Sequence, residues 1–222
     1  ATVRDVANRA EDLNLIKDNL GLEIEILSGE EEAKLAFVGA AISTEVAEGV
    51  LTDIGGGSSE IVLIDQGKVI KSVSLSIGSL SAFNDYVDGL FADKSDRKEI
   101  EKRIDQLLED SLMYAEDQKI LAAVGWSARA SLKFYKEYYK LDDSVRSMDA
   151  SEFNKMLKEI LKADDRSKLD MILAVKPDRV HTLLPGMIIL NKICKFFSID
   201  TINVSQTGVR EGYVYSKLLG RK

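Results

Sequence analysis

The residues best suited to phosphate chemistry lie in one short run, residues 51–60, where Asp53 and Glu60 flank three glycines and a serine. Between the two carboxylates, the candidates for binding phosphate are Gly55, Gly56, Gly57 and Ser58. Consecutive glycines permit positive φ angles and close backbone approach, and their amides can form an anion-binding nest. Asp53 and Glu60 could hold Mg²⁺ directly or through water. The alternative is a glycine-rich hairpin turn with acidic flanks.

This run does not fit the common nucleotide-binding motifs. No Gly-Lys-Ser or Gly-Lys-Thr ends it, so it is not a Walker loop. No Gly-x-Gly-x-x-Gly opens a helix after it, so a dinucleotide-binding fingerprint is excluded as well. A phosphate site here would therefore be of another kind.

A second group of candidates is the acidic cluster at residues 30–32. Ser28 and Glu31 have the spacing of a capping box, which would begin a helix extending to about residue 42. Glutamates in a first helical turn are commonly explained by capping and by the helix dipole. Glu32 lies just beyond the capping pair, so it is the member of the cluster that is available for chemistry.

The elements that must position these residues can be read from the apolar pattern. Residues 49–54, 60–65 and 68–75 are predicted strands, and Gln66-Gly67 is a predicted two-residue hairpin turn between the last two. The three strands would form an antiparallel meander. Further strands are predicted at residues 22–27, 120–124 and 201–204. The predicted helices cover residues 6–20, 28–42, 98–118, 128–139, 150–161, 166–173, 179–197 and 209–219.

Strands that form a meander and then alternate singly with helices indicate a mixed α/β or α+β layered domain. The chain has 222 residues, 45% of them hydrophobic, which is enough for one large domain or two small ones. The 30 basic and 37 acidic residues give a formal charge of -7, which argues against a nucleic-acid partner.

The rare residue types exclude several kinds of site. One cysteine, Cys194, permits no intrachain disulfide, and it favours a reducing, cytoplasmic setting. With one histidine, His181, neither a histidine metal site nor a Ser-His-Asp triad is expected. The most apolar stretch, residues 186–197, is broken by lysines well short of the ~20 residues of a membrane span, so no membrane association is expected.

Several segments together resemble the exopolyphosphatase/guanosine-pentaphosphate phosphohydrolase (Ppx/GppA) family. Residues 53–60, Asp-Ile-Gly-Gly-Gly-Ser-Ser-Glu, resemble the family's second phosphate loop, and residues 24–33 resemble its Ile-Glu-Ile-Ile-Ser-Gly-x-Glu-Glu-Ala segment. Residues 2–8, 185–186 and 204–212 resemble the family's Thr-x-Arg-x-Ala-x-Asn, Pro-Gly and Val-Ser-x-x-Gly-Leu-Arg-Glu-Gly segments. Order and spacing agree over nearly the whole chain, which makes the set far more specific than one glycine loop.

The resemblance implies an α/β fold of the actin-like ASKHA (ribonuclease-H-type) class, with the active site between two domains. Residues 1–46 would be the C-terminal part of domain I, and residues 47–222 would be the complete domain II. The family's N-terminal phosphate loop, Asp-x-Gly-Ser-Asn-Ser, is not found in this sequence, which begins at Ala1 rather than at methionine. The 222-residue chain alone is therefore expected to be inactive or very weak.

The resemblance also implies roles for individual residues. Glu32 matches the catalytic base that activates the attacking water, and Asp53 and Glu60 match acidic residues that position Mg²⁺. The predicted phosphate-binding residues are Gly55, Gly56, Gly57, Ser58, Arg4, Gly125 and Ser127. Where the family usually has Gly-Gly-Thr, this chain has Gly125-Trp126-Ser127, so an indole ring would reshape part of the site or serve as a core anchor. Arg129 and Lys133, on the helix that follows, could meet a polyanion or form a solvated helix face.

The function that the resemblance implies is Mg²⁺-dependent hydrolysis of terminal phosphoanhydride bonds, in inorganic polyphosphate or in guanosine pentaphosphate. A non-catalytic sensor of polyphosphate or nucleotide is the main alternative, and an actin-like ATPase or sugar kinase is a weaker one. The sequence does not choose between the two substrates. A homodimer is possible by analogy with the family.

Overall fold

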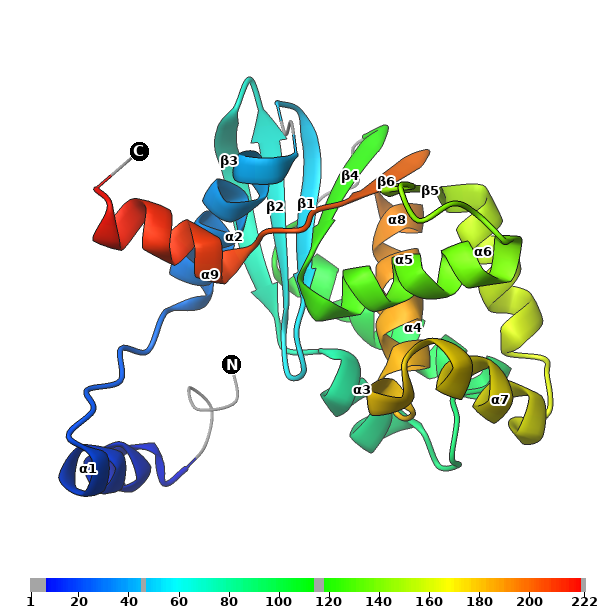
Figure 1. Cartoon of the computed structure of the whole chain (residues 1–222), viewed down its shortest axis with the longest axis horizontal. Coiled ribbons are helices and arrows are strands. Elements are labelled where there is room, and N and C mark those ends of the chain that lie inside the picture. The colour runs from blue at the N-terminus through cyan, green and yellow to red at the C-terminus, as the bar shows by residue number, and fades with distance from the viewer. Residues whose placement is uncertain (1–6, 45–46, 114–117, 221–222) are drawn as a thin grey trace.

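The computed structural model describes residues 7–44, 47–113 and 118–220. Its centre is a six-stranded mixed sheet in the order β3-β2-β1-β4-β6-β5 (Figure 1). The strands are β1 (Gly49–Ile54), β2 (Ser59–Asp65), β3 (Lys68–Leu75), β4 (Ile120–Val124), β5 (Ser147–Asp149) and β6 (Thr201–Val204). Every strand predicted after residue 48 is present, and the short edge strand β5 is an addition.

The predicted antiparallel meander is confirmed. β1 pairs with β2 and β2 with β3, both antiparallel, and Asp53 lies directly opposite Glu60. Gln66 (φ 49°) and Gly67 (φ 71°) form the two-residue turn, in the left-handed conformation that suits a hairpin. β4 is parallel to β1 and β6 is parallel to β4, so these three strands end at the same edge of the sheet.

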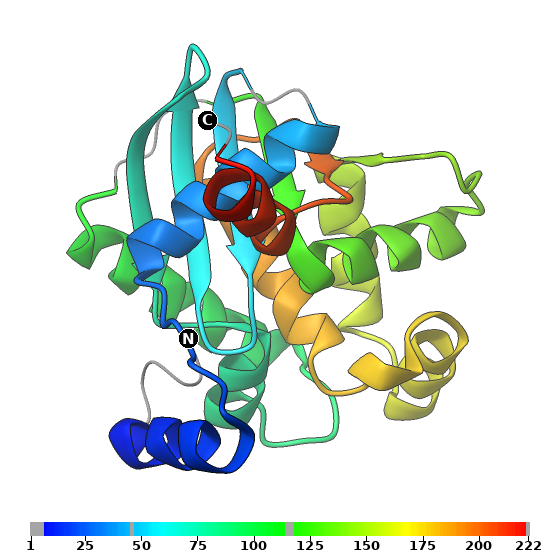
Figure 2. The ribbon, with the colours of Figure 1, turned by 60° about the vertical axis from the view of Figure 1, so that its left-hand side comes forward.

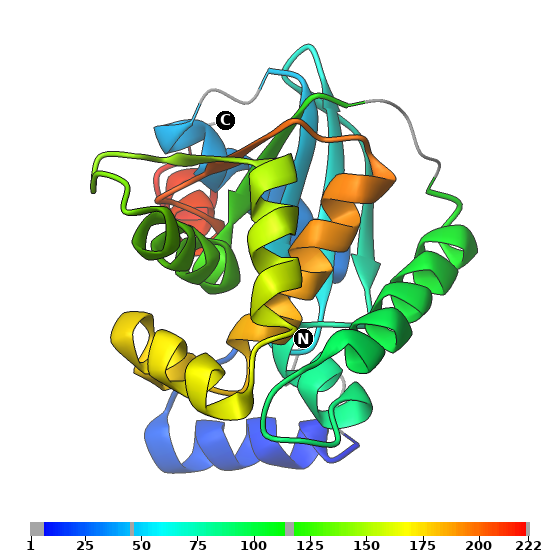
Figure 3. The ribbon, with the colours of Figure 1, turned by 90° about the vertical axis from the view of Figure 1, so that its right-hand side faces the viewer.

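Helices cover both faces of the sheet. One face carries the larger core, beneath α3 (Ser79–Tyr86), α4 (Lys94–Asp110), α5 (Gly125–Tyr139), α6 (Ala150–Ile160) and α8 (Leu183–Phe196), and α7 (Asp165–Val175) packs on α5 (Figure 3). The other face carries α2 (Gly29–Ser43) and α9 (Val209–Tyr213), which is followed by the π-helical turn η2 (Val214–Leu218). Successive side chains of β1 point to opposite faces of the sheet, so Val50 lies in the larger core and Leu51 in the smaller one.

The start of α2 has the predicted capping box. The Ser28 hydroxyl accepts a hydrogen bond from the Glu31 amide at 3.2 Å, and the Glu31 carboxylate accepts one from the Ser28 amide at 2.9 Å. The hydrogen bonds that the Ser28 amide and hydroxyl donate to the Glu31 carboxylate lower the pKa of Glu31. The two bonds of the capping box satisfy amides that would otherwise lack partners at the helix end. They fix the start of α2, and with it the position of Glu32 in the first turn.

Close backbone contact fixes α2 against the C-terminal segment. A Cβ atom on Gly39 would lie 1.9 Å from the carbonyl oxygen of Gly208, and one on Gly212 would lie 2.0 Å from the carbonyl oxygen of Leu35. Only glycine allows backbones to approach this closely. The contact holds the helix that carries Glu32 beside the loop that follows β6.

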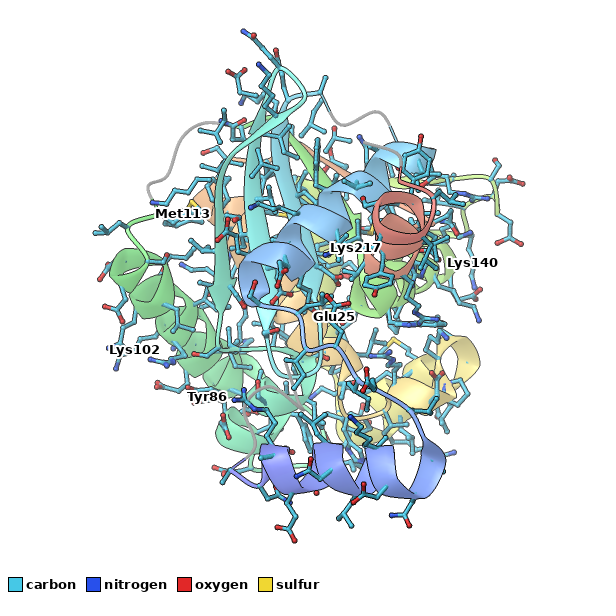
Figure 4. The ribbon with its side chains drawn as sticks, turned by 90° about the vertical axis from the view of Figure 1, so that its left-hand side faces the viewer. Glu25, Tyr86, Lys102, Met113, Lys140 and Lys217 are labelled. Carbon is cyan, nitrogen blue, oxygen red and sulfur yellow. The ribbon has the colours of Figure 1, made fainter. Side chains whose placement is uncertain are left out.

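Residues 22–27 are not a strand, contrary to the alternating pattern. They form an irregular link between α1 (Arg9–Leu20), which has no buried residue and lies apart from the sheet (Figure 2), and α2. Alternation predicts a strand only if a neighbouring strand supplies hydrogen bonds, and no strand of the described part pairs with this segment. Instead, Glu25 accepts a hydrogen bond from the Tyr213 hydroxyl at 2.7 Å and lies 3.9 Å from Lys217 (Figure 4).

Other helix boundaries differ from the prediction. The helix predicted at residues 98–118 begins at Lys94, capped by Asp93, and ends at Asp110, and α3 was not predicted. The helix predicted at residues 179–197 is divided into the 3₁₀ turn η1 (Pro177–Arg179) and α8. The predicted domain boundary after residue 46 falls at residues outside the described part, and the division into 1–46 and 47–222 stays a prediction.

Within the residues that the structure describes, no helix is long and apolar enough to cross a membrane. Cys194 is buried in α8, as expected of a small hydrophobic side chain.

Candidate functional site

A cavity of about 530 Å³ opens at the edge of the sheet where the three parallel strands end. Each strand leads directly into the cavity wall: β1 into Gly55, β4 into Gly125, and β6 into the loop that contains Gln206 and Gly208. Carboxyl ends of parallel strands are the usual place for ligand sites in α/β folds. The remaining lining residues are Glu32, Asp53, Ile54, Gly56, Trp126, Arg129, Arg179, Val209, Arg210 and Glu211.

The cavity brings together five of the residues predicted for the site. These are Glu32, Asp53, Gly55, Gly56 and Gly125. Four others lie close in the chain but do not line the cavity: Gly57, Ser58, Glu60 and Ser127. Arg4 lies outside the described residues. The roles assigned to all of them remain predictions.

The glycine loop is held by the start of α3. The carbonyl oxygen of Gly56 accepts hydrogen bonds from the amides of Leu80 (2.9 Å) and Ser81 (3.0 Å), and that of Gly55 accepts one from Ser79 (2.9 Å). The Gly55 amide donates to the Ser58 carbonyl oxygen at 2.9 Å. In the described part of the chain, the amides of Gly56 and Gly57 have no acceptor, so they are available to an anion.

The loop does not use the positive φ angles that three glycines permit. Positive φ at this site occurs instead at Gly125, where φ is 82°. Close packing requires glycine at the start of α3, since a Cβ atom on Gly78 would lie 2.5 Å from the Gly56 carbonyl carbon, whereas one on Gly56 would meet no atom nearer than 3.8 Å. The loop is therefore shaped by its contact with α3 rather than by left-handed backbone.

Two carboxylates face each other across the first two strands. Asp53 and Glu60 are directly opposite in the antiparallel register, an arrangement that is unfavourable for like charges. Glu60 is buried and accepts hydrogen bonds from the hydroxyls of Ser58 and Ser74, both at 2.8 Å. Burial raises the pKa of Asp53 to about 7, with further contributions from Glu60 and Glu32, while Arg129 opposes the rise.

The donor set is compatible with a magnesium ion. Magnesium prefers carboxylate oxygens and is usually held by one or two carboxylates together with substrate phosphates and waters. Asp53 and Glu60 are the carboxylates predicted for such a pair, and a cation would oppose the burial and the like charges that raise the pKa of Asp53. Among the residues described, no group of three His, Cys, Asp or Glu side chains forms a candidate metal site.

The first residue of α5 must be glycine. A Cβ atom on Gly125 would lie 2.2 Å from Asp53 Oδ1 and 3.2 Å from its Cγ, and the backbone there is left-handed. The carboxylate of Asp53 thus lies against the N-terminal end of α5, where helix amides favour negative charge. The hydroxyl of Ser127, which does not line the cavity, donates to the Ile54 carbonyl oxygen at 2.8 Å.

We expect Gly125→Ala to destabilise the protein by more than the ~1–3 kcal/mol of left-handed strain alone, because the methyl group also displaces Asp53. Urea unfolding gives the free energy difference. Gly67→Ala is a matched control, since Gly67 also has positive φ (71°) but no atom within 4 Å of its added Cβ. Equal losses for the two variants would mean that the contact between Gly125 and Asp53 imposes no constraint.

Three arginines also line the cavity, and the sequence did not assign two of them to it. Arg129 was noted on α5, whereas Arg179 follows α7 and Arg210 belongs to α9. Burial lowers the pKa of Arg129, and the neighbouring Arg210 and Arg179 lower it further against the opposing effect of Asp53 and Glu211. Arg210 lies in a segment with a family resemblance, but its place depends on the strand order, which one sequence does not reveal.

Comparison with known proteins matches residues 1–221 to the model of the Ppx/GppA phosphatase family. A curated relative from Haemophilus influenzae, named as a candidate exopolyphosphatase, is 25% identical over 97% of this chain. The chain spans 66% of the length of that relative.

Solved structures share the fold. An exopolyphosphatase from Cytophaga hutchinsonii superposes with a TM-score of 0.81 at 19% identity, covering 99% of this chain and 73% of that one. A Ppx/GppA family member from Aquifex aeolicus gives a TM-score of 0.77 at 22% identity, covering 98% and 72%. The expected actin-like ASKHA fold is confirmed by these likenesses.

Proposed function

Because the chain belongs to the Ppx/GppA phosphatase family, we propose that it hydrolyses the terminal phosphoanhydride bond of inorganic polyphosphate, with guanosine pentaphosphate as a second substrate. The names of the Haemophilus and Cytophaga relatives favour polyphosphate.

The observation that carries the proposal is the mixed lining of the cavity. Glu32 and Asp53 share it with Arg129, Arg179 and Arg210, and with backbone from Gly55, Gly56 and Gly125. Guanidinium groups and free amides suit phosphate oxygens, whereas a carboxylate suits the proton of an attacking water. A site built only to bind a polyanion would have no need for carboxylates among its cations.

In the proposed reaction, Glu32 holds a water molecule and accepts its proton as the oxygen attacks the terminal phosphorus. The bond from that phosphorus to the bridging oxygen breaks, so orthophosphate is released and the shortened chain leaves with the bridging oxygen as an oxyanion. Little covalent chemistry is required of the protein, because phosphoryl transfer depends mainly on positioning and charge neutralisation. The arginines and the loop amides supply that neutralisation.

Asp53 and Glu60 would hold Mg²⁺ in this scheme. When bound, the ion supplies positive charge to the phosphate oxygens and lowers the cost of the opposed carboxylates. The amide groups at the start of α5 stabilise the negative charge of Asp53 even without a metal. The side chain of Ser58, which donates to Glu60, keeps that carboxylate oriented.

Release of orthophosphate from tripolyphosphate by the full-length protein, measured with Mg²⁺ and again with excess EDTA, tests the proposal; the 222-residue chain alone is expected to be inactive or very weak in the same assay. We expect release only with the metal, and faster release from tripolyphosphate than from ATP. Tight binding of tripolyphosphate without any release would instead indicate the non-catalytic sensor. Preference for ATP with transfer to glycerol or a sugar would indicate a kinase, and both results would contradict the proposed hydrolysis.

A further inference from the structure

Trp126 stands at the rim of the cavity in an unusual electrostatic setting. It is the only tryptophan in the sequence, and its side chain is 49% exposed, so it is not a core anchor. Three cations from separate parts of the chain lie over its ring. The distances to the ring centroid are 4.9 Å for Arg129 Cζ, 5.6 Å for Lys176 Nζ and 5.8 Å for Arg210 Cζ.

The two arginines of this group have no direct ion pair in the part of the chain that the structure describes. Within the described ranges, no carboxylate oxygen lies within 4.0 Å of the guanidinium nitrogens of Arg129 or Arg210. The one hydrogen bond from Arg129 goes to the Gln206 carbonyl oxygen at 3.4 Å. Lys176 lies 3.6 Å from Asp178, whose carboxylate is exposed, so this pair contributes little. Glu211 acts on Arg129 and Arg210 and Asp53 acts on Arg129, but only through space, so the guanidinium groups keep hydrogen-bond donors for a further anion.

The ring explains how the cations can stay together. An indole face attracts guanidinium and ammonium groups, by ~0.5–1 kcal/mol when exposed and more when water is excluded. It offsets only part of the repulsion among three like charges, so the cluster favours an anion beside it. A nucleobase would need the same ring face that the cations cover, which makes a phosphate group the better match.

We propose that Trp126, Arg129, Lys176 and Arg210 form a second phosphate subsite, which holds the phosphates that follow the reacting one. Trp126 is the positioning residue of this subsite, because it holds the cations through its ring and makes no hydrogen bond to phosphate itself. The inference rests on the proposed function in one respect: the terminal phosphate of the chain is taken to occupy the cavity beside Glu32 and Asp53.

Isothermal titration calorimetry with two inorganic probes tests the subsite without any turnover. Orthophosphate is a single phosphate group and cannot span both sites, whereas tripolyphosphate can occupy the two together. We expect Trp126→Leu to weaken tripolyphosphate binding by about tenfold and orthophosphate binding by less than twofold. Trp126→Phe retains an aromatic face and should bind tripolyphosphate within about threefold of the wild type.

The sole tryptophan supplies an independent readout. Tripolyphosphate should change the fluorescence of Trp126 in the wild type, and orthophosphate should change it much less. Lys119→Gln, which removes an exposed lysine beside Asp200 and far from the cavity lining, is the control for nonspecific loss of charge. Circular dichroism and thermal unfolding identify any variant that has lost its fold.

Three results would overturn the subsite. If folded Trp126→Leu bound tripolyphosphate with the wild-type affinity, the ring would have no role in the subsite. Equal weakening of both probes would mean general damage to the cavity. Fluorescence quenching by guanosine, which carries no phosphate, would indicate a base-stacking platform instead. Failure of the proposed hydrolysis would show separately, as absent phosphate release with intact tripolyphosphate binding.

Discussion

Glu32→Gln is expected to slow the release of phosphate from tripolyphosphate by about 10²–10⁴-fold, the usual contribution of a positioned general base. Glutamine keeps the size of the side chain but cannot accept the proton of the attacking water. Affinity for tripolyphosphate should change by less than about threefold, because the cations and amides of the cavity are untouched. Single-turnover phosphate release and calorimetry separate the two effects.

Glu30→Gln is the matched control for this prediction. Glu30 lies two residues earlier in the first turn of α2, does not line the cavity, and pairs with Lys34 at 2.7 Å. Its replacement should leave phosphate release within about twofold of the wild type. Equal rates for Glu32→Gln and Glu30→Gln would remove Glu32 from the chemistry.

Asp53→Asn should have opposite effects on activity and stability. We expect phosphate release to fall by at least about 10²-fold, because the residue that would hold Mg²⁺ loses its charge. In EDTA at pH 8, the variant should unfold at a higher temperature than the wild type. Asparagine removes a partly buried charge that faces Glu60 and lies near Glu32. A gain of about 1 kcal/mol corresponds to roughly 2–4 °C for a chain of this size.

The stability gain should depend on pH in a defined direction. The pKa of Asp53 is about 7 in the folded state, whereas an unperturbed aspartate has a pKa of 3.8. The folded wild type therefore binds this proton more strongly than the unfolded chain, and it loses stability as the pH rises from about 4 through 7. The advantage of Asp53→Asn should be small at pH 4.5 and largest at pH 8.

Asp65→Asn, at the exposed end of β2, is the control for changes of net charge. It should alter neither phosphate release nor the pH dependence of unfolding. An Asp53→Asn variant that is less stable than the wild type at pH 8 would contradict the electrostatic account of the Asp53–Glu60 pair. Full activity of that variant with Mg²⁺ would contradict its place in the proposed site.

Local signals in the sequence predicted local structure well. Ser28 and Glu31 predicted the start of α2 because both halves of the capping box lie within three residues. Gln66-Gly67 predicted the hairpin for the same reason. The prediction of a strand at residues 22–27 was wrong. The alternation of apolar and acidic residues is a property of one segment, whereas a strand also needs a partner strand beside it. The division of residues 179–197 into η1 and α8 was likewise not encoded in the apolar pattern.

The site was predicted in part. The family resemblance brought Glu32, Asp53 and Gly125 forward, and the structure gathers all three at one cavity. Arg210 was missed because its place depends on β1, β4 and β6 being parallel neighbours, and Arg179 because the place of η1 depends on the packing of α7 on α5. Conversely, the hydroxyl of Ser127 was predicted for phosphate but is committed to the Ile54 carbonyl oxygen. Spacing along the chain does not reveal the direction of a side chain.

The most direct test of the account is a crystal structure of Glu32→Gln with tripolyphosphate and Mg²⁺. We expect a terminal phosphate within hydrogen-bond distance of the Gly56 or Gly57 amide, on the side of the cavity that carries Asp53. Phosphate bound instead at the separate surface hollow of Lys34 and Lys71, with the glycine loop empty, would contradict it.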